Sequence, residues 1–320
     1  MANNQLMVGS DQTLDESLNT LISEFRLTSE YTGVMRSCAT DMKLEAHSGR
    51  SKIIDTFGKF TAQSLSYGED IVNAQEISDR QTSYSPNEVG LKVIIPDLTL
   101  RRIADPDFYG KIGQVMATAY RNKEDKDGCD QLSSFTSTNL GAAGTALSLG
   151  LIHAASARIK TGSKRRTSTT DVEPPPAPHY GIFHSYSLSR VMGTLVPFTD
   201  VPTGTNDYDG ASANAQTIAA GTNGMTESIL RQGTPAAMTL DGLKIKAEDN
   251  LLVDSSDDCT GAVFARQGLV FVSELDVTEK VEKDASARAK EVVMYGSYTW
   301  GVYKPDVYGI PATLDATQPS

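Results

Sequence analysis

The stretch EVVMYGSYTWGVYKPDVYGI, residues 291–310, decides the fold of this chain. A strand formed by these residues carries apolar and aromatic side chains on both faces, because successive residues of a strand point to opposite sides. One face holds Val292, Met294, Gly296, Tyr298, Trp300 and Val302, and the other holds Val293, Tyr295, Ser297, Thr299 and Tyr303. We therefore predict a long strand that is covered on both faces.

The residues before this strand indicate its neighbours. The stretch AVFARQGLVFVSEL, residues 262–275, is rich in Val, Phe and Leu and is expected to supply a partner strand. The charged stretch DVTEKVEKDASARA, residues 276–289, is expected to form the connection or hairpin that leads into the long strand.

The composition allows a sizeable core and excludes several classes of protein. With 320 residues, 39% hydrophobic and 22% charged, the chain can fold as one elaborated domain or two closely packed ones. A formal net charge of -11 argues against tight binding of nucleic acid through phosphate contacts, which needs clustered Lys and Arg. The cysteines have no metal-binding or redox spacing, which suits a reducing compartment. They are Cys38, Cys129 and Cys259.

The N-terminal residues contain no basic region followed by an apolar run, and no apolar stretch is long enough to span a bilayer. We expect a protein that is neither exported by a signal peptide nor embedded in a membrane. Apolar residues at helical spacing predict helices over 13–26, 105–128 and 145–162. In the second helix, Asp105 is the expected N-cap and Gly128 the expected end, and the predicted buried face holds Phe108, Ile112, Val115, Met116 and Ala119.

Residues 50–104 have β character, with Val, Thr and Tyr in two arms around a polar middle. They predict a long two-stranded excursion that has little core of its own and must lie on another part of the chain or on another copy. Residues 163–178 are basic, then hydroxylic, then proline-rich, and are expected to form a solvated loop. Residues 199–228 hold almost no large apolar side chains and predict a surface loop or lid.

The sequence predicts no catalytic, cofactor-binding or metal-binding residue, because it contains none of the familiar motifs for these functions. The stretch NKEDKDG, residues 122–128, has a calcium-loop composition, but Lys123 stands at the first ligand position. His179 and His184 are five residues apart in a predicted strand, so they face opposite sides. Cys259 follows SSDD, an anionic neighbourhood that raises a thiol pKa and lowers its reactivity.

The order of these segments resembles the major capsid protein of tailed bacteriophages, which has the Hong Kong 97 shell fold. The resemblance covers nearly the whole chain, from RRIADPDFYGKIGQVMATAY at 101–120 to the C-terminal strands. It is densest at 261–315, where GAVFAR, DASARA, YGSYTWGV and the start of YGIPATLDAT follow in the expected order. No single motif is diagnostic, and the specificity lies in the ordered set.

The resemblance implies an α+β fold with an N-terminal arm, an extended β-hairpin loop, a peripheral domain with a long spine helix and long β-strands, and an axial domain. The implied segments are the arm at 1–48, the extended loop at 49–104, the spine helix at 105–139, the axial domain at 140–260 with an insertion at 199–228, and the peripheral strands and C-terminus at 261–320.

The resemblance also implies a function. Copies of the chain are expected to assemble into pentamers and hexamers of an icosahedral shell in the host cytoplasm, enclosing double-stranded DNA without sequence-specific binding. A separate scaffolding protein and a portal protein are the expected partners, a decoration protein is a further one, and no cofactor is expected. Because buried aromatic residues dominate interface energies, we expect inter-subunit anchors in the extended loop, with packing inside one subunit as the equal alternative. These candidates are Phe57, Phe60, Tyr67 and Tyr84.

Other functions stay open on the sequence alone. A shell of the same fold could enclose a cellular nanocompartment, as encapsulins do, and particle size and cargo would separate the two. A hydrolase with a site under the 199–228 segment would need converging titratable groups in a pocket. A tail or decoration protein would form rings or tubes, or bind only to preformed shells.

Overall fold

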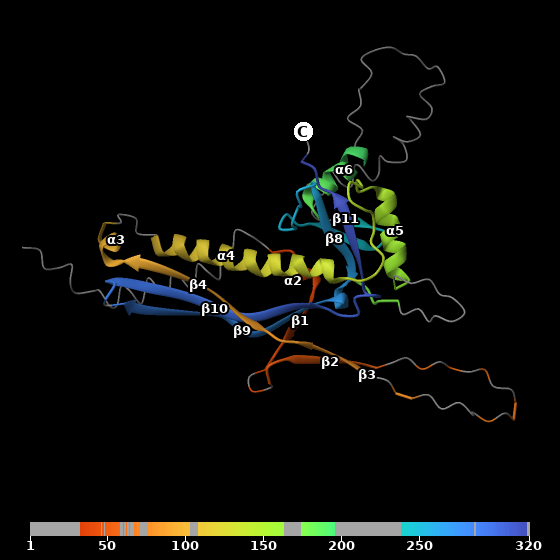
Figure 1. The fold of residues 1–320 in the computed structure, drawn as a ribbon, viewed down its shortest axis with the longest axis horizontal. Coiled ribbons are helices and arrows are strands. Elements are labelled where there is room, and N and C mark those ends of the chain that lie inside the picture. The colour runs from red at the N-terminus through yellow and green to blue at the C-terminus, as the bar shows by residue number, and fades with distance from the viewer. Residues whose placement is uncertain are drawn as a thin grey trace, which may run out of the picture.

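The computed structural model describes the chain from 33 to 318, except for 103–107, 163–173, 196–237, position 285 and scattered positions between 46 and 78. Figure 1 shows a long helix along one face of a four-stranded sheet, a second sheet of five strands, and a two-stranded ribbon. The expected helix 13–26, the basic run 164–166 and the segment 199–228 lie outside the described residues. Within the described part of the chain, no helix has the length and apolar character needed to cross a membrane.

The four-stranded sheet has the order β1-β9-β10-β4 and joins segments that are far apart in the sequence. β1 runs parallel to β9, whereas β10 is antiparallel to both of its neighbours. The strands are β1 (Thr40–Lys43), β4 (Asn87–Pro96), β9 (Leu269–Asp284) and β10 (Ala289–Val302). The prediction of a long strand over 291–302 with an antiparallel partner is therefore confirmed.

The predicted start of that partner was wrong, because residues 262–265 belong to β8 in the other sheet and β9 begins only at Leu269. Of the two alternatives for the charged stretch, the hairpin is found: residues 276–284 continue β9 and pair with β10. Alternate residues such as Val277 and Val281 pack towards the core, while the charges between them face water. The Asp284 carboxylate accepts hydrogen bonds from the Ser286 and Ala287 backbone N–H groups in the turn between the two strands.

The long helix α4 (Phe108–Asp130) confirms the helix predicted over 105–128, but its end was misplaced. Gly128 lies inside α4, and the 3-10 helix η2 (Gln131–Ser134) follows directly. Gly128 packs closely at this position, since a Cβ on it would lie 3.1 Å from both the Met35 Cβ and the Trp300 ring. The predicted buried face was also partly wrong, because Val115 is 69% exposed and Ala119 faces solvent.

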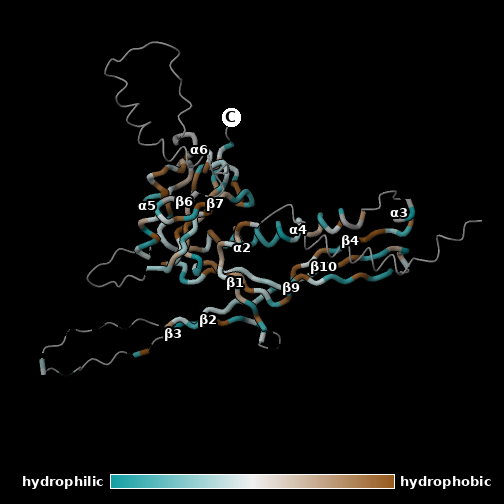
Figure 2. Tube along the Cα trace, turned by 180° about the vertical axis from the view of Figure 1, so that it is seen from behind, coloured by the Kyte–Doolittle hydropathy of each residue, from teal (hydrophilic) through white to brown (hydrophobic). Residues whose placement is uncertain are grey.

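The face of β10 under α4 forms the main core of this sheet. Val292, Met294, Tyr298 and Trp300 are buried there, and the Trp300 indole N–H donates to the Glu124 carbonyl oxygen at 2.9 Å. Figure 2 shows that the two elements differ in hydropathy. Much of the stretch labelled α4 is hydrophilic, whereas β4 is largely hydrophobic. The opposite face of β10 is only half-buried in the single chain.

The five-stranded sheet has the order β11-β8-β5-β7-β6. Its core includes Phe183, Val263 and Ile310 together with Ile152 and Ile159 from α5. The helix predicted over 145–162 is confirmed as α5, which starts after the N-cap Ser148 and ends just before Gly162. The elements of this part are α5 (Leu149–Lys160), β5 (His179–Phe183), α6 (Ser185–Leu195), β6 (Met238–Leu240), β7 (Leu243–Ala247), β8 (Asp258–Ala265) and β11 (Gly309–Asp315), with the 3-10 helix η4 (Arg266–Gly268) leading from β8 into β9.

The segment expected as one extended loop at 49–104 divides between three places. β2 (Lys52–Phe57) pairs with β3 (Asp79–Tyr84) as the two-stranded ribbon. β4 pairs with β10 along ten residues instead, and α3 (Asp97–Arg102) follows it directly. The described hairpin is therefore shorter than the sequence indicated, because the apolar alternation of β4 fits the groove between β10 and α4. N-terminal to the ribbon, the short helix α2 (Met35–Cys38) packs against α4.

Candidate functional site

The β2–β3 ribbon projects from the rest of the described chain (Figure 1). Its inner face is held by two hydrogen bonds: Thr56 Oγ1 donates to the Tyr303 hydroxyl at 2.9 Å, and the Tyr84 hydroxyl donates to the Val302 carbonyl oxygen at 2.9 Å. Burial alternates along β2, so that every second residue points away from the body. The outer face of the ribbon touches no other described element of the chain closely enough to be buried.

The four predicted anchors divide between two environments. Phe57 is 68% exposed, Phe60 59% exposed and Tyr67 fully exposed, whereas Tyr84 is buried among residues of its own chain. Tyr84 therefore takes the intramolecular role that the sequence left open. Ile53 and Ile77 are also exposed on this hairpin, at 51% and 72%. Neither was among the predicted anchors, although Ile53 lies on the same face of a strand as Phe57, because alternate residues of a strand point to the same side.

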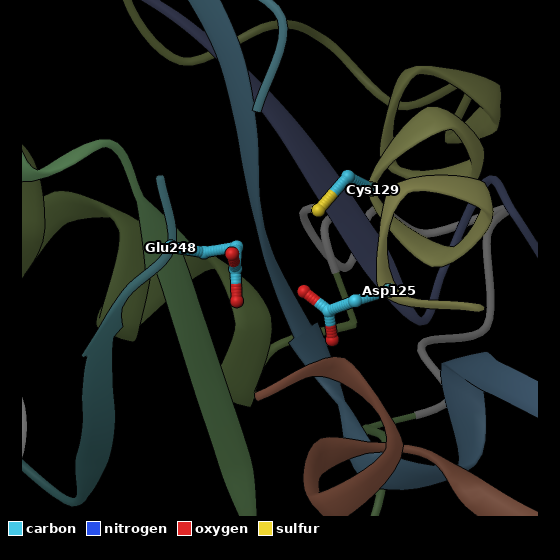
Figure 3. A group of neighbouring side chains, drawn as sticks. All are labelled: Asp125, Cys129 and Glu248. Atoms are coloured by element: carbon cyan, nitrogen blue, oxygen red, sulfur yellow. The ribbon is translucent and has the colours of Figure 1, made fainter. Parts of the chain in front are cut away.

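A second candidate site is a buried group of three side chains between α4 and the residue that follows β7. Figure 3 shows Asp125, Cys129 and Glu248 pointing toward one another, and their ligand-type atoms lie within 4.8 Å of each other. Two carboxylates and a sulfur are donor types that a divalent cation accepts. Among the described residues this is the one group of three such side chains that lies this close together.

The hydrogen bonds of this group indicate a structural role. Asp125 accepts from the Met35 backbone N–H at 3.0 Å and from the Asn250 side chain at 3.4 Å, and Glu248 accepts from the Asn250 backbone N–H at 3.0 Å. Burial, with the nearby Asp125 and Glu248 charges, raises the pKa of the Cys129 thiol well above its usual range. The group thus contains a protonated thiol and two engaged carboxylates, and it joins α2, α4 and the end of β7.

The remaining titratable candidates do not converge on a pocket. His179 lies in β5, and His184 follows it directly, with its Nδ1 accepting from the Tyr186 backbone N–H at 3.2 Å. Burial lowers the pKa of His184, and burial followed by the Asp258 and Asp254 charges raises the pKa of Cys259 to about 11. The calcium-like stretch 122–128 lies inside α4, so it has no loop with which to wrap an ion. Two described hydroxyl groups contact a charged side chain: Ser297 donates to the Glu274 carboxylate at 3.1 Å, and Ser37 Oγ accepts from the Lys246 amine at 2.6 Å.

Comparisons with known proteins give likeness only at the level of structure. No family model and no curated protein sequence matches the chain. A chain from Mycobacterium phage Che8 matches at 18% identity and a TM-score of 0.61, over 92% of this chain and 95% of that one.

Two further structures extend this likeness. A chain from the head of Helicobacter pylori bacteriophage KHP40 matches at 10% identity and a TM-score of 0.64, over 89% of this chain and 92% of that one. A chain from the capsid of Ralstonia phage GP4 matches at 13% identity and a TM-score of 0.60, over 90% of both chains. The matches run along almost the whole length of each chain, and they confirm the α+β fold that the resemblance implied.

Proposed function

We propose that this chain, which has the Hong Kong 97-type fold of phage capsid chains, is the major capsid protein of a tailed bacteriophage. Copies of it form pentamers and hexamers of an icosahedral shell that encloses double-stranded DNA. The observation that carries the proposal is the β2–β3 hairpin, which presents Phe57, Phe60 and Tyr67 to solvent. A structural role fits the likeness of this fold to phage capsid chains.

The exposed aromatic side chains of this hairpin need a partner that covers them. A two-stranded ribbon is marginally stable in water by itself, and exposed aromatic residues on it mark a surface for a partner. Burying one such side chain contributes about 2 kcal/mol. In a shell of identical subunits the partner is a second copy, so we assign Phe57, Phe60 and Tyr67 as inter-subunit anchors. Tyr84 instead fixes the base of the hairpin to its own subunit.

The expected domain assignment is kept as part of the proposal. Residues 1–48 form the arm, the hairpin at 52–84 is the loop that overlaps a neighbour, and the α4 sheet and the five-stranded sheet are the peripheral and axial parts. The partners that we propose are a separate scaffolding protein, a portal protein and a decoration protein, and the chain resides in the virion after assembly in the host cytoplasm. The net charge of -11 supports a container that does not bind its DNA tightly.

Sedimentation velocity with a matched pair of variants tests this proposal. One variant carries Phe57→Ser, Phe60→Ser and Tyr67→Ser, and the control carries Leu252→Ser, which alters an exposed apolar side chain outside the hairpin. The wild-type chain, expressed with its neighbouring reading frames, should sediment as large particles, and the control should do the same. The triple variant should stay as single subunits or small oligomers with unchanged thermal unfolding.

Two results would count against the proposal. A wild-type chain that sediments only as a monomer or dimer would refute the shell function altogether. Particles that hold no DNA in infected cells but enclose a protein cargo would instead favour a nanocompartment shell of the same fold.

A further inference from the structure

The buried group formed by Asp125, Cys129 and Glu248 has the donor atoms and the placement of a metal site. Its two carboxylates and its sulfur lie within 4.8 Å of one another and point toward one another (Figure 3). Asp125 is 3% exposed, Cys129 4% and Glu248 2%. The group includes no residue of the hairpin that carries the proposed shell function.

Helix α4 and strand β7 place these three side chains. Asp125, which comes from the calcium-like stretch 122–128, and Cys129 are four residues apart in α4, and this spacing puts them on the same face of the helix. Zinc-binding helices that supply two ligands use the same spacing. Glu248 follows β7 directly, and its backbone N–H donates to the Phe183 carbonyl oxygen at 3.0 Å. The group therefore joins the helix over the four-stranded sheet to the end of a strand in the five-stranded sheet.

Hydrogen bonds orient both carboxylates of the group. Asp125 Oδ1 accepts from the Met35 backbone N–H at 3.0 Å, and Glu248 Oε1 accepts from the Asn250 backbone N–H at 3.0 Å. The Asn250 side chain also donates to Asp125 Oδ2 at 3.4 Å, so that one residue contacts both carboxylates. Such outer contacts fix metal ligands in place. Because a carboxylate has about four lone-pair sites, it can accept hydrogen bonds and ligate an ion at the same time.

A cavity of about 420 Å³ adjoins the group, because Cys129 belongs to the group and also lines the cavity. The other lining residues include three carboxylates and no Lys, Arg or His. These carboxylates belong to Asp130, Asp254 and Asp258. A cavity lined by charges of one sign concentrates ions of the opposite sign, so this cavity supplies an entry path for a cation.

The donor set selects zinc over the common hard cations. Calcium takes about six to eight oxygen ligands, whereas zinc accepts sulfur and carboxylate oxygen together in a four-coordinate site. Two buried carboxylates at this separation repel each other, and a divalent cation between them attracts both. We propose that Asp125, Cys129 and Glu248 bind a zinc ion, with a water molecule from the cavity as the remaining ligand.

Zinc bound in this way would stabilise the folded subunit. As the Zn–S bond forms, the Cys129 S–H proton passes to solvent. The ion ties α4 to the end of β7, and the unfolded chain holds no such arrangement of ligands. After treatment of the full chain with a chelator, Zn²⁺ at about a hundredfold excess over its dissociation constant should raise the Tm of the unassembled subunit by about 5 °C. Mg²⁺ at the same concentration should leave the Tm unchanged.

Calorimetric titration of the chelator-treated full chain with Zn²⁺ tests the site directly. The wild type should bind about one Zn²⁺ per chain, as three ligands from a single group require. Cys129→Ser and Glu248→Gln should each weaken binding by about 100-fold or more, since loss of an outer partner alone costs about 10- to 100-fold.

Two variants serve as matched controls for this titration. Cys259→Ser removes a buried thiol outside the group, and Asp130→Asn removes an exposed carboxylate of the cavity. Both variants should bind Zn²⁺ as the wild type does.

Spectroscopy on the wild type keeps the test decisive if a variant folds poorly. Co²⁺ bound in place of Zn²⁺ should show the near-ultraviolet absorption of a cobalt–thiolate bond. X-ray absorption of the zinc-loaded chain should show sulfur at about 2.3 Å and oxygen ligands at about 2.0–2.2 Å.

Three results would overturn the zinc site. The first is a wild-type chain that binds no Zn²⁺. The second is binding that Cys129→Ser and Glu248→Gln leave unchanged, which would place the ion on carboxylates elsewhere. The third is a zinc spectrum without sulfur, which would exclude Cys129 as a ligand. None of these results bears on shell assembly, which the sedimentation experiment measures separately.

Discussion

Replacing Gly128 with alanine should destabilise the subunit, although the same change in an ordinary helix stabilises it. Alanine is favoured over glycine in a helix interior by about 1 kcal/mol. At this position, however, the new Cβ would lie 3.1 Å from Trp300 ring atoms and 3.1 Å from the Met35 Cβ. Forcing a methyl group into such a packed site costs about 1–3 kcal/mol, so the net effect should be a loss of about 1 kcal/mol.

The variant Trp300→Phe provides the matched background. It removes the ring atoms that the new methyl group would meet, and it also removes the indole N–H bond to the Glu124 carbonyl oxygen. That hydrogen bond contributes about 1 kcal/mol, so the single variant should be destabilised. In this background Gly128→Ala should be neutral or stabilising, because only the Met35 contact remains tight. The two changes should therefore couple favourably by about 1–2 kcal/mol.

Urea unfolding measures the stability of four unassembled subunits: the wild type, Gly128→Ala, Trp300→Phe and the double variant. The experiment uses a protein concentration at which light scattering reports single chains. Energies that add within about 0.5 kcal/mol would contradict the packing described for α4 and β10. A stabilising Gly128→Ala in the wild-type background would contradict it as well.

Three further predictions concern groups outside that contact. Burial holds the pKa of His184 below its unfolded value of 6.5, so the unfolded state binds more protons in acid. The free energy of unfolding should therefore fall as the pH drops below about 6.5. His184→Asn should flatten this part of the stability profile, and an unchanged profile would refute the lowered pKa of His184. The buried thiols, with the pKa of Cys259 near 11, should react with a thiol reagent at pH 8 only after unfolding, so rapid labelling of the native subunit would contradict the structure. Tyr84→Phe removes the bond to the Val302 carbonyl oxygen and should cost about 1 kcal/mol in urea unfolding without reducing particle yield, whereas a loss of assembly at unchanged stability would make Tyr84 an inter-subunit residue.

The sequence predicted those elements whose own residues carry the signal, such as apolar spacing or a glycine at a helix end. Helix α5 follows from its apolar spacing and from Gly162, and β10 follows from its two apolar faces. The end of α4 was misplaced because Gly128 is a stop signal by itself, and its close contacts with Met35 and the Trp300 ring, both distant in the sequence, are tertiary. The sequence left residues 276–289 open between a plain connection and a hairpin, because Val281 becomes half-buried only once α4 lies over it.

The candidate surface was predicted in part. The sequence predicted which aromatic residues lie in the hairpin, but it did not predict which of them are exposed and which are buried. Burial there depends on tertiary contacts of the hairpin with Val302 and Tyr303.

Electron microscopy of the purified chain, expressed alone and then with its neighbouring reading frames, tests the central claim most directly. The account predicts closed shells, rings of five or six subunits, or spirals built from the same contacts. A uniform monomer or dimer under both conditions would contradict it.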